Sequence, residues 1–482
     1  MRRLAILFVI TAVLSGCCRG NVFAIDGNVE TVLVPDSVSV LRNPCCGWGL
    51  YDDADDEVAD AGEYWTKQAE AAKYASFFYI RWRWSDIEPE EGRYAWIYDD
   101  NYKALVQGAL DRGLRLAFRI YVNGMDNIRP GTPSYVREAG ARGKIVGGHW
   151  TPYLDDRIFQ QKMEKFISAF ANEYDNPVLV DFVDAANVGW WGECHHLNIE
   201  DENNRDSVLL WLTDTYGNAF SRVPLVMPVC SEFGIDAEMK YAVARNGYGF
   251  RRDGLGSKWF TPLEKEVVSS LFPGTLLLGE QCYWKGDESD SLYFNDDVYE
   301  FSNWRQVLQA AYDDAIAFHF NTLDLREPVE SGRWLTKAAD LVKAFIANGG
   351  YRLYPSVISA PEVVRRGTQA AIAHRWENMA SGYFPNSDKR WNYKYKVAFA
   401  LLDGAGETKA IFIDHHSDPS NFIKGQCVDY LLYADVENIE PGEYSWAVAI
   451  VDVTSGNRPG IRLAVEGPET GGWTLLNKVR VK

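Results

Sequence analysis

The feature that most constrains this chain is a repeated pairing of a short apolar run with a segment of helical periodicity. Strands are predicted at residues 37–50, 75–84, 114–122, 178–188, 224–230, 248–251, 275–281 and 315–321, and helices at 63–74, 99–112, 157–174, 206–220, 235–245, 263–270 and 335–348. Eight strands over about 310 residues, seven of them followed by a predicted helix, match one closed (β/α)8 barrel. An open doubly wound sheet is the alternative, but the sequence lacks the glycine fingerprint that such a sheet normally carries near its first strand.

The pattern changes after Gly350, where helical periodicity fades and short alternating runs follow. They occupy residues 370–376, 393–402, 408–413, 428–434, 444–452, 461–465 and 475–481, and Gly, Asp, Asn and Pro separate them. This spacing is typical of an antiparallel β-sandwich. We therefore expect an α/β fold with two domains. A (β/α)8 TIM barrel over residues 31–352 carries the catalytic-like site, and a C-terminal antiparallel β-sandwich over residues 353–482 is an accessory domain.

The N-terminus has the pattern of an export signal. Two arginines precede an apolar run at residues 4–14, and the segment Leu14-Ser15-Gly16-Cys17 follows. That segment resembles a bacterial lipobox, which implies a signal peptide at residues 1–16, lipidation of Cys17 and a tether at residues 17–30. We expect an exported bacterial lipoprotein, periplasmic or on the cell surface, that meets the membrane through its anchor alone. An ordinary signal cut a few residues later, which would release a soluble protein, is the alternative.

The charge balance argues against nucleic acid as a partner. The chain has 49 Lys and Arg against 67 Asp and Glu, a net charge of -18 at pH 7, so it would repel a polyanion. Aromatic residues are abundant, with 17 Trp, 26 Tyr and 23 Phe. Aromatic side chains in a cleft suit the flat apolar faces of sugars, while a Trp-rich core accounts for most of them. Composition therefore favours a carbohydrate partner and leaves the oligomeric state open.

The side chains that could carry chemistry are those predicted at the carboxyl ends of the barrel strands, because active sites of this fold lie there. Strands two to four contribute Arg81, Arg83, Trp84, Asp86, Glu88, Arg119, Asn123, Asp184, Asn187, Trp190, Trp191, Glu193, His195 and His196. Strands five to eight contribute Ser231, Glu232, Arg251, Arg252, Asp253, Glu280, Gln281, Tyr283, Trp284, His319 and Asn321. Carboxylates, arginines and tryptophans at one rim predict a site for a polyhydroxylated ligand.

Two of these carboxylates are the preferred catalytic pair. Glu193 follows the fourth predicted strand, and Glu280 lies at the end of the seventh. Two opposed carboxyl groups suffice to hydrolyse a glycosidic bond, since one protonates the leaving oxygen and the other attacks the anomeric carbon or activates water. The sequence therefore predicts a glycoside hydrolase that requires no cofactor and no metal.

A motif after the second strand supports this interpretation. The segment Trp82-Arg83-Trp84-Ser85-Asp86-Ile87-Glu88-Pro89-Glu90-Glu91-Gly92-Arg93-Tyr94-Ala95-Trp96 resembles the second-strand signature of barrel glycosidases such as the β-galactosidases. That superfamily carries its acid/base Glu at the end of strand four and its nucleophile Glu at the end of strand seven. The resemblance implies that Glu193 is the acid/base and Glu280 the nucleophile, with retention of the anomeric configuration.

A second resemblance covers nearly the whole mature chain. Asn-Pro-x-x-Gly-Trp-Gly at residues 43–49, the Glu-Pro-x-x-Gly stretch, Gly-x-Trp-Gly-Glu-x-His at residues 189–195 and the C-terminal sandwich resemble a family of bacterial secreted proteins known only as a domain of unknown function. This likeness implies the fold more than the activity.

The residues at the predicted rim suggest substrate contacts, and the glycosidase resemblance shows one departure. Trp84, Trp191, Tyr283 and Trp284 are candidates for stacking on sugar rings, and Arg83, Asn123 and His195 for binding hydroxyl groups; Glu88, Arg119, Asn187 and Asp253 complete the predicted substrate-binding set. In the glycosidase superfamily an Asn that contacts the sugar 2-hydroxyl usually precedes the acid/base Glu, whereas Gly192 stands there in this chain. Asn187 is a candidate to replace it.

Other interpretations remain open. Arg81, Arg83 and Arg119 could form salt bridges that hold the carboxylates as scaffold. A catalytically silent barrel would make the protein a glycan-binding surface lipoprotein, and His195 or Tyr283 could serve as the base of a lyase. His195 and His196 could bind a metal, but no third ligand stands at a useful spacing. A Cys194–Cys230 disulfide is conceivable, although the sparse cysteine pattern argues against it.

Overall fold

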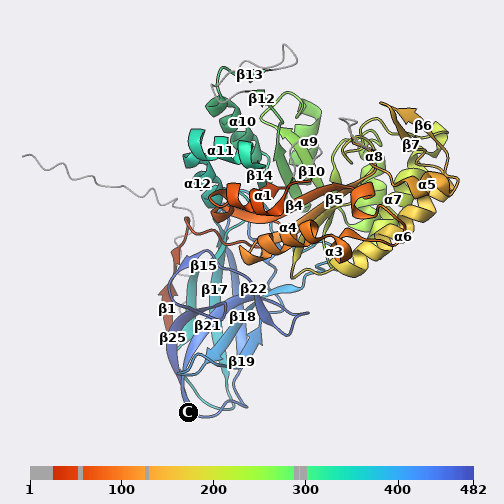
Figure 1. Ribbon diagram of the computed structural model, residues 1–482. Coiled ribbons are helices and arrows are strands. Elements are labelled where there is room, and N and C mark those ends of the chain that lie inside the picture. Colours follow the sequence, from red (N-terminus) through yellow and green to blue (C-terminus); the bar gives the residue numbers. More distant parts are fainter. Residues whose placement is uncertain (1–24, 53–57, 125–129, 287–291, 294–300) are drawn as a thin grey trace, which may run out of the picture.

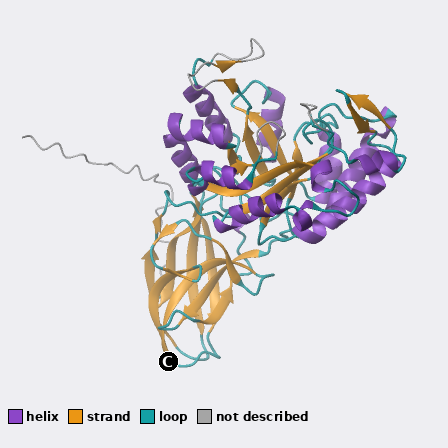
Figure 2. Ribbon diagram, in the orientation of Figure 1, coloured by secondary structure: helices purple, strands orange, loops and turns teal. Residues whose placement is uncertain are grey.

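The computed structural model describes residues 25–52, 58–124, 130–286, 292–293 and 301–482. Helices and a parallel sheet form one part of the molecule, and a strand-rich part lies beside it (Figures 1 and 2). Within the described residues no helix is both long enough and apolar enough to cross a bilayer. The predicted lipidation site Cys17 and the predicted signal peptide lie outside the described residues.

Eight parallel strands form the predicted barrel. Around the sheet they are β11 (Leu277–Gln281), β10 (Gly249–Leu255), β9 (Leu225–Pro228), β8 (Val180–Asp184), β5 (Arg115–Tyr121), β4 (Ala75–Arg83), β3 (Gly47–Tyr51) and β14 (Thr322–Arg326). The two edge strands also meet, since the Asn321 amide donates to the Leu277 carbonyl at 2.8 Å. The expected TIM barrel is therefore confirmed.

Helices surround this sheet. The longer ones are α1 (Ala61–Lys67), α4 (Asp100–Asp111), α6 (Arg157–Tyr174), α7 (Arg205–Ala219), η3 (Glu238–Arg245), α9 (Pro262–Leu271), α10 (Trp304–Ala317), α11 (Pro328–Lys337) and α12 (Ala339–Asn348). Shorter ones are η1 (Ala71–Lys73), α2 (Trp84–Ile87), α3 (Ala95–Tyr98), α5 (Ser134–Glu138), η2 (Glu202–Asn204) and α8 (Ile235–Ala237); β6 (Gly143–Val146) pairs with β7 (His149–Pro152), and β12 (Lys285–Gly286) with β13 (Leu292–Tyr293).

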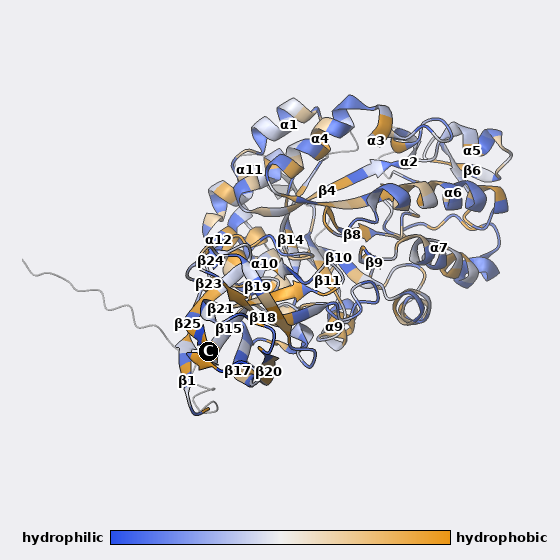
Figure 3. Ribbon diagram, turned by 90° about the horizontal axis from the view of Figure 1, so that it is seen from below, coloured by the Kyte–Doolittle hydropathy of each residue, from blue (hydrophilic) through white to orange (hydrophobic). Residues whose placement is uncertain are grey.

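Helix α6 shows why the helical predictions succeed. The Asp156 carboxylate caps its first turn by accepting from two backbone amides, and Phe159, Met163, Phe166 and Phe170 recur on its buried face. Hydrophilic and hydrophobic residues alternate along the helices around the barrel (Figure 3). Such a pattern fixes both the helix and the face that packs on the sheet.

The eighth strand is not where the sequence pattern predicted it. Residues 315–317 belong to helix α10, and the strand is β14, whose Leu-Asp-Leu-Arg alternation is shorter and more polar than the apolar run before it. The predicted rim residues His319 and Asn321 therefore precede the strand and lie at the opposite end of the barrel. His319 contacts the Ser381 carbonyl at 2.7 Å, and the Asn321 side chain donates to the Tyr383 carbonyl at 2.7 Å. The predicted helix 335–348 is likewise two helices, α11 and α12.

The C-terminal part is a sandwich of two antiparallel sheets. One contains β1 (Asn28–Val32), β15 (Leu353–Pro361), β17 (Gln369–Asn378) and β20 (Val428–Asp435); the other contains β16 (Val363–Val364), β25 (Trp473–Val481), β21 (Gly442–Asp452), β18 (Tyr395–Leu402) and β19 (Thr408–Ile413), with β22 (Arg458–Ile461) and β24 (Glu469–Thr470) beside it. A short pair joins β2 (Val34–Pro35) to β23 (Val465–Glu466), and η4 (Pro419–Asn421) is a single turn. Because β1 pairs with β15, residues 28–32 lie in the sandwich, not in the tether or the barrel as predicted.

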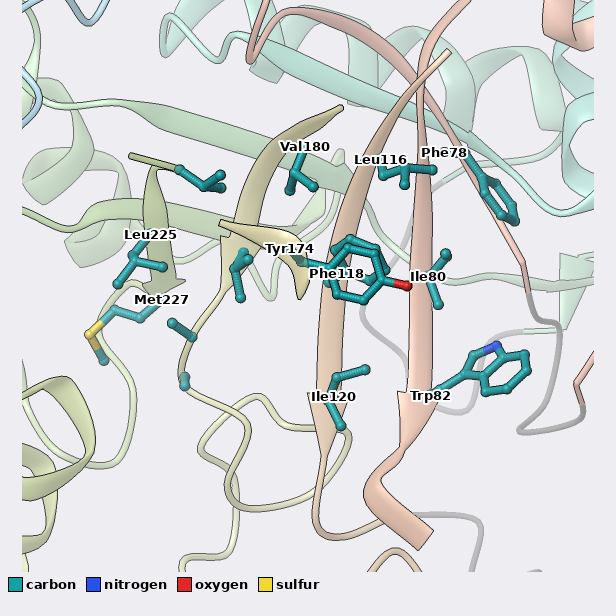
Figure 4. Close-up of a cluster of buried hydrophobic side chains, with 14 of the residues drawn as sticks. Phe78, Ile80, Trp82, Leu116, Phe118, Ile120, Tyr174, Val180, Leu225 and Met227 are labelled. Atoms are coloured by element: carbon teal, nitrogen blue, oxygen red, sulfur yellow. The ribbon is translucent and has the colours of Figure 1, made fainter. Parts of the chain in front are cut away.

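Alternation along the barrel strands separates two kinds of core. Phe78, Ile80 and Trp82 of β4 and Leu116, Phe118 and Ile120 of β5 belong to the core between sheet and helices (Figure 4). The alternate residues Phe77 and Ala117 point into the barrel and share one apolar cluster with Tyr351 and Tyr395 at the sandwich. The sandwich end of the barrel is thus filled with apolar side chains, which leaves the carboxyl end for polar ones.

Candidate active site

Two arginines and three carboxylates fill the barrel interior at the carboxyl ends of the strands. Arg119 donates through Nη1 to Glu193 Oε1 and through Nη2 to Glu280 Oε1, both at 2.7 Å. Arg251 reaches the same two oxygens, at 3.3 Å and 3.0 Å. Asp184 Oδ2 accepts from the Nε atoms of both arginines, at 2.9 Å and 2.6 Å. We call these five residues the carboxylate–arginine cluster.

Strand geometry explains how the cluster assembles. Arg119 lies on β5, Arg251 on β10, and Asp184 and Glu280 lie at or near the ends of β8 and β11. Each side chain points inward because the neighbouring strand residues pack outward against the helices. Asp184 holds both Nε atoms and thereby directs the terminal nitrogens of both guanidinium groups toward the two glutamates.

The cluster is buried, so its charges must compensate one another. The side chains of Glu193 and Glu280 are only 8% and 4% exposed, and the other three are still less exposed. Two guanidinium groups about 4 Å apart repel each other by about 4 kcal/mol in a protein-like dielectric. Each arginine pairs with three carboxylates, so attraction outweighs that repulsion. Three carboxylates against two arginines leave one surplus negative charge.

Glu280 is held in its anionic form. Burial alone would raise the pKa of its carboxyl group, but the nearby charges of Arg251, Arg119, Arg81 and Arg326 together hold that pKa well below its usual range. A carboxylate of this kind is suited to act as a nucleophile and unsuited to donate a proton.

Glu193 is presented by a tight turn after β8. Its amide donates to the Trp190 carbonyl at 2.9 Å, and the Cys194 amide donates to the Val188 carbonyl at 2.9 Å. Gly192 has φ +72°, and a Cβ there would lie 2.9 Å from Tyr121 Cβ. Glycine is therefore required at this position, which explains why the Asn expected before the acid/base Glu is absent.

A second charged group lies beside the cluster and was not anticipated from the sequence. Asp324 and Arg326, at the end of β14, form an ion pair at 2.5 Å, and Glu330 lies 3.6 Å from Arg326. Burial, with the charges of Glu280 and Glu330, raises the pKa of Asp324 to about 7 against the opposing effect of Arg326. Correct placement of the eighth strand would have identified these residues by the same rule that identified Glu280.

Three residues predicted to contact substrate are buried structural residues. Trp84 begins α2 and packs with Tyr135, Phe159 and Phe166. Its indole donates to Glu88 Oε2 at 2.8 Å, and Glu88 also accepts from the Tyr135 hydroxyl and the Gly92 amide, both at 2.7 Å. Arg83 is buried and pairs with Asp86 at 2.9 Å. The chain turns into a helix directly after β4, so these side chains enter the core and the predicted stacking role of Trp84 is wrong.

Asn187 and Trp284 are also turned away from the rim. The Asn187 amide donates to the Tyr216 hydroxyl at 3.0 Å and contacts Met163 Sδ at 3.4 Å, so it cannot replace the missing Asn. Trp284 is buried with Cys282, Trp304 and Val307, which leaves no ring face for a sugar. Both predicted substrate contacts are therefore corrected.

The remaining predicted residues lie at the rim, by which we mean the carboxyl ends of the barrel strands and the loops after them. His195 is 47% exposed, and its Nε2 lies 3.9 Å from Glu193 Oε2. Trp191 is partly exposed, its ring lies nearly perpendicular to that of His195 with 6.4 Å between the centroids, and Tyr283 is 49% exposed. The backbone of Asn123 forms an isolated β-bridge with that of Trp190. The Asp253 carboxylate forms an ion pair with Arg252 at 2.5 Å.

An exposed tryptophan at the rim was missed. Trp259 is 53% exposed and lies in the loop between β10 and α9. The sequence pattern ended the sixth strand at Arg251, whereas β10 continues to Leu255. With the longer strand, Trp259 falls in the loop directly after a barrel strand, which is the position that the fold assigns to ligand contacts.

Sulfur and metal chemistry are not indicated at this site. Cys194 and Cys230 are both free, as expected. Among the described residues no group of three or more His, Cys, Asp or Glu side chains is arranged to hold a metal ion. His195 and His196 contact different groups. His195 lies near Glu193, whereas the centroid of the His196 ring lies 3.7 Å from that of the Trp190 ring.

Comparison with known proteins finds similar structures but no similar sequence. No protein-family model matches the chain, and no curated protein matches it. Among solved structures, endo-glycoceramidase II from Rhodococcus sp. is 12% identical with a TM-score of 0.42, over 84% of this chain and 99% of that one. A GH30 endoxylanase from Clostridium papyrosolvens C71 is 13% identical with a TM-score of 0.38, over 84% and 97%. The catalytic domain of a β-amylase from Paenibacillus polymyxa is 10% identical with a TM-score of 0.41, over 58% and 92%.

Proposed function

We propose that the protein is a glycoside hydrolase that cleaves an oligo- or polysaccharide through Glu193 and Glu280. The observation that carries the proposal is the convergence of these two carboxylates on one guanidinium group, that of Arg119, at the end of the barrel where this fold performs chemistry. One guanidinium and two hydrogen bonds separate the pair. This keeps the pair within the range of glycosidase carboxylates, which are ~5–5.5 Å apart in retaining and ~6.5–9.5 Å apart in inverting enzymes.

The contacts of each carboxylate suggest its role. Glu280 binds both arginines and has a strongly lowered pKa, so it is the nucleophile. The cluster carries one more carboxylate than arginines, and Glu193 is the most exposed of the three, with Oε2 directed toward His195. Both arginines bind Glu193 through Oε1, so Oε2 is the oxygen through which Glu193 would act as the general acid.

The reaction then proceeds in two displacements. Glu280 attacks the anomeric carbon while Glu193 gives its proton to the glycosidic oxygen, so that the C–O bond breaks and the leaving sugar departs as an alcohol. Glu193, now a carboxylate, takes a proton from water as that water attacks the anomeric carbon and releases Glu280. Two inversions give net retention of the anomeric configuration.

We further propose that the enzyme is exported and held at the membrane by a lipid on Cys17. The lipobox-like segment Leu14-Ser15-Gly16-Cys17 after a charged and apolar N-terminus supports this. The C-terminal sandwich then serves as an accessory domain beside the barrel.

A second candidate function is glycan binding without hydrolysis. The observation that favours it is the engagement of Glu193 Oε1 by two buried arginines, which also makes Glu193 part of the ion-pair scaffold of the barrel. Asn187, bound to Tyr216, also leaves no Asn to contact the 2-hydroxyl of a sugar.

Hydrolysis of a panel of aryl glycosides and natural oligosaccharides separates the two functions. The panel is run with wild type, Glu193→Gln, Glu280→Gln and, as a matched control, Glu88→Gln, a buried carboxyl outside the carboxylate–arginine cluster that accepts from Trp84, Tyr135 and Gly92. We expect turnover by wild type and by folded Glu88→Gln, with at least about 10³-fold loss in the other two variants. Full activity in a folded Glu280→Gln variant would refute the mechanism, and glycan binding without turnover in all four proteins would establish the second function.

A further inference from the structure

Two exposed aromatic side chains lie in the loops that follow two neighbouring barrel strands, beyond the carboxylate–arginine cluster. Tyr283 follows β11, the strand that carries Glu280, and Trp259 follows β10, the strand that carries Arg251. They are 49% and 53% exposed. Large aromatic side chains left half-exposed at a functional rim usually have a ligand to contact.

A chain of hydrogen bonds joins the two loops that carry them. The Trp259 amide donates to Ser257 Oγ at 3.1 Å, and the Ser257 hydroxyl donates to the Gly254 carbonyl at 2.7 Å. The Ser257 side chain also hydrogen-bonds with Cys282, the residue before Tyr283. The Cys282 amide in turn donates to the Leu255 carbonyl at 2.9 Å. The contact between Ser257 and Cys282 therefore lies two residues from Trp259 and one residue from Tyr283 along the chain.

The Trp259 loop is held rigidly. The Arg252 guanidinium donates to the Trp259 carbonyl and pairs with Glu264 at 3.1 Å, and Glu264 completes the capping box of α9 with Thr261. Gly256 has φ +79°, and a Cβ there would lie 2.5 Å from the Ala311 amide nitrogen, so the loop packs closely against α10. A loop whose backbone is already fixed loses little conformational freedom when a ligand binds to a side chain that it carries.

Tyr283 connects this pair to the charged interior. The Arg326 guanidinium carbon lies 5.9 Å from the Tyr283 ring centroid, and Arg326 is one of the charges that lower the pKa of Glu280. Tyr283 therefore lies beside Arg326, which in turn acts on Glu280.

We infer that Tyr283 and Trp259 form an aromatic ledge on which further sugar rings of an oligosaccharide chain rest. The inference rests on the proposed function and deepens it. A ledge beyond the catalytic pair can contact a chain of several sugars, whereas a single sugar at the catalytic pair would not reach it. Sugar rings present flat apolar C–H faces, and an aromatic ring complements them. Trp259 is the residue to replace in a test, since Tyr283 also contacts Arg326 and its replacement would disturb the charged interior.

The test compares two substrates of the sugar that the panel identifies, a short aryl glycoside and an oligosaccharide of several residues. We expect Trp259→Ala to lower kcat/KM for the oligosaccharide about tenfold through KM and to leave the aryl glycoside unchanged. Trp259→Phe should restore most of the loss. Leu263→Ala removes an aliphatic side chain of similar exposure (62%) from the first turn of α9 and should change neither substrate.

The outcomes separate this inference from the proposed function. Equal effects of Trp259→Ala on both substrates, or no effect on either, would overturn the ledge while leaving hydrolysis intact. If the protein binds the oligosaccharide without cleaving it, calorimetry replaces kinetics, and Trp259→Ala should weaken the affinity about tenfold; unchanged affinity overturns the ledge. A wild-type protein that neither cleaves nor binds any member of the panel contradicts both proposals.

Discussion

Glu193 and Glu280 accept hydrogen bonds from the two terminal nitrogens of the same guanidinium group, that of Arg119, each at 2.7 Å. The arginine therefore fixes both the distance between the carboxylates and the direction of one oxygen of each. Asp184 orients that arginine through Nε. The geometry of the proposed reaction thus depends on Asp184, whose side chain is fully buried.

Replacement of Asp184 by Asn tests this dependence. The variant keeps the shape of the side chain but removes the charge that holds the Nε atoms of Arg119 and Arg251, so we expect kcat to fall roughly 10²-fold through misplacement of the glutamates. Steady-state kinetics measure the effect. KM should change little, because Asp184 is fully buried.

Asp181 offers the matched control for this experiment. It lies on the same strand, is equally buried and pairs with Arg115, but it lies at the sandwich end of the barrel beside Cys45. Asp181→Asn should destabilise the fold by about 3 kcal/mol or more, as breaking a buried ion pair does, without lowering kcat of the folded protein. Equal losses of kcat in both variants would reduce Asp184 to a purely structural residue.

The acid side of the pH profile reports on Glu280. Its nucleophilic form is the carboxylate, and the arginines hold its pKa well below the usual range, so wild-type kcat/KM should not decline from protonation of Glu280 down to about pH 4. Arg251→Gln removes the largest favourable charge. The pKa of Glu280 then rises, so the loss of kcat/KM on acidification should begin at the same or a higher pH in the variant than in wild type. An acid limb that moves to lower pH in the variant would contradict the role of Arg251.

Glu238 should make stability fall as pH rises. Burial raises the pKa of its carboxyl group to about 7, even though the Cys230 and Ser231 amides and the Ser231 hydroxyl donate to it. Between the ordinary value of 4.5 and about 7, the folded protein holds a proton that the unfolded chain releases, so the free energy of unfolding decreases with rising pH, by up to about 1.4 kcal/mol per pH unit. The change is complete above about pH 7.

Urea unfolding at pH 5 and pH 7.5 measures this contribution. Glu238→Gln cannot ionise, so its stability should decline less than that of wild type between the two pH values. A decline of the same size in both proteins would assign the pH dependence to other groups.

Trp84 should matter for stability and not for substrate. Trp84→Phe removes the hydrogen bond to Glu88 and part of a buried ring contact with Phe166, and we expect a loss of about 1–3 kcal/mol in unfolding free energy. KM for any substrate should stay within twofold of wild type. A large increase in KM with full stability would return Trp84 to the substrate site.

The sequence pattern predicts the barrel well because its helices and inner strands follow simple rules. The α6 helix has a capping Asp156 and a regular apolar face, and β4 is a long β-rich run, so both were located within a residue or two. The eighth strand was misplaced because the apolar end of α10 is indistinguishable from a buried strand by composition. That single error moved His319 and Asn321 to the rim and hid Asp324 and Arg326.

The site was predictable only as far as strand ends could be recognised. Glu280 and Arg119 lie on the strands themselves, where alternation decides which way a side chain points. Trp84 and Asn187 follow strands, and the direction of the chain after a strand depends on local turns that no periodicity encodes. Trp84 enters a helix at once, and Asn187 takes φ +36° with its amide against Tyr216. The ion pairs of the cluster depend on which strands become neighbours.

The central claim is that Glu280 attacks the anomeric carbon, and trapping of the covalent intermediate tests it most directly. A slowly turned over 2-fluoro aryl glycoside of the preferred sugar is incubated with the enzyme, and mass spectrometry of the proteolysed protein locates the added sugar. The account predicts one glycosylated peptide, modified at Glu280, that is absent from Glu280→Gln. A label on any other residue, or release of product with inverted anomeric configuration and no covalent label, would contradict it.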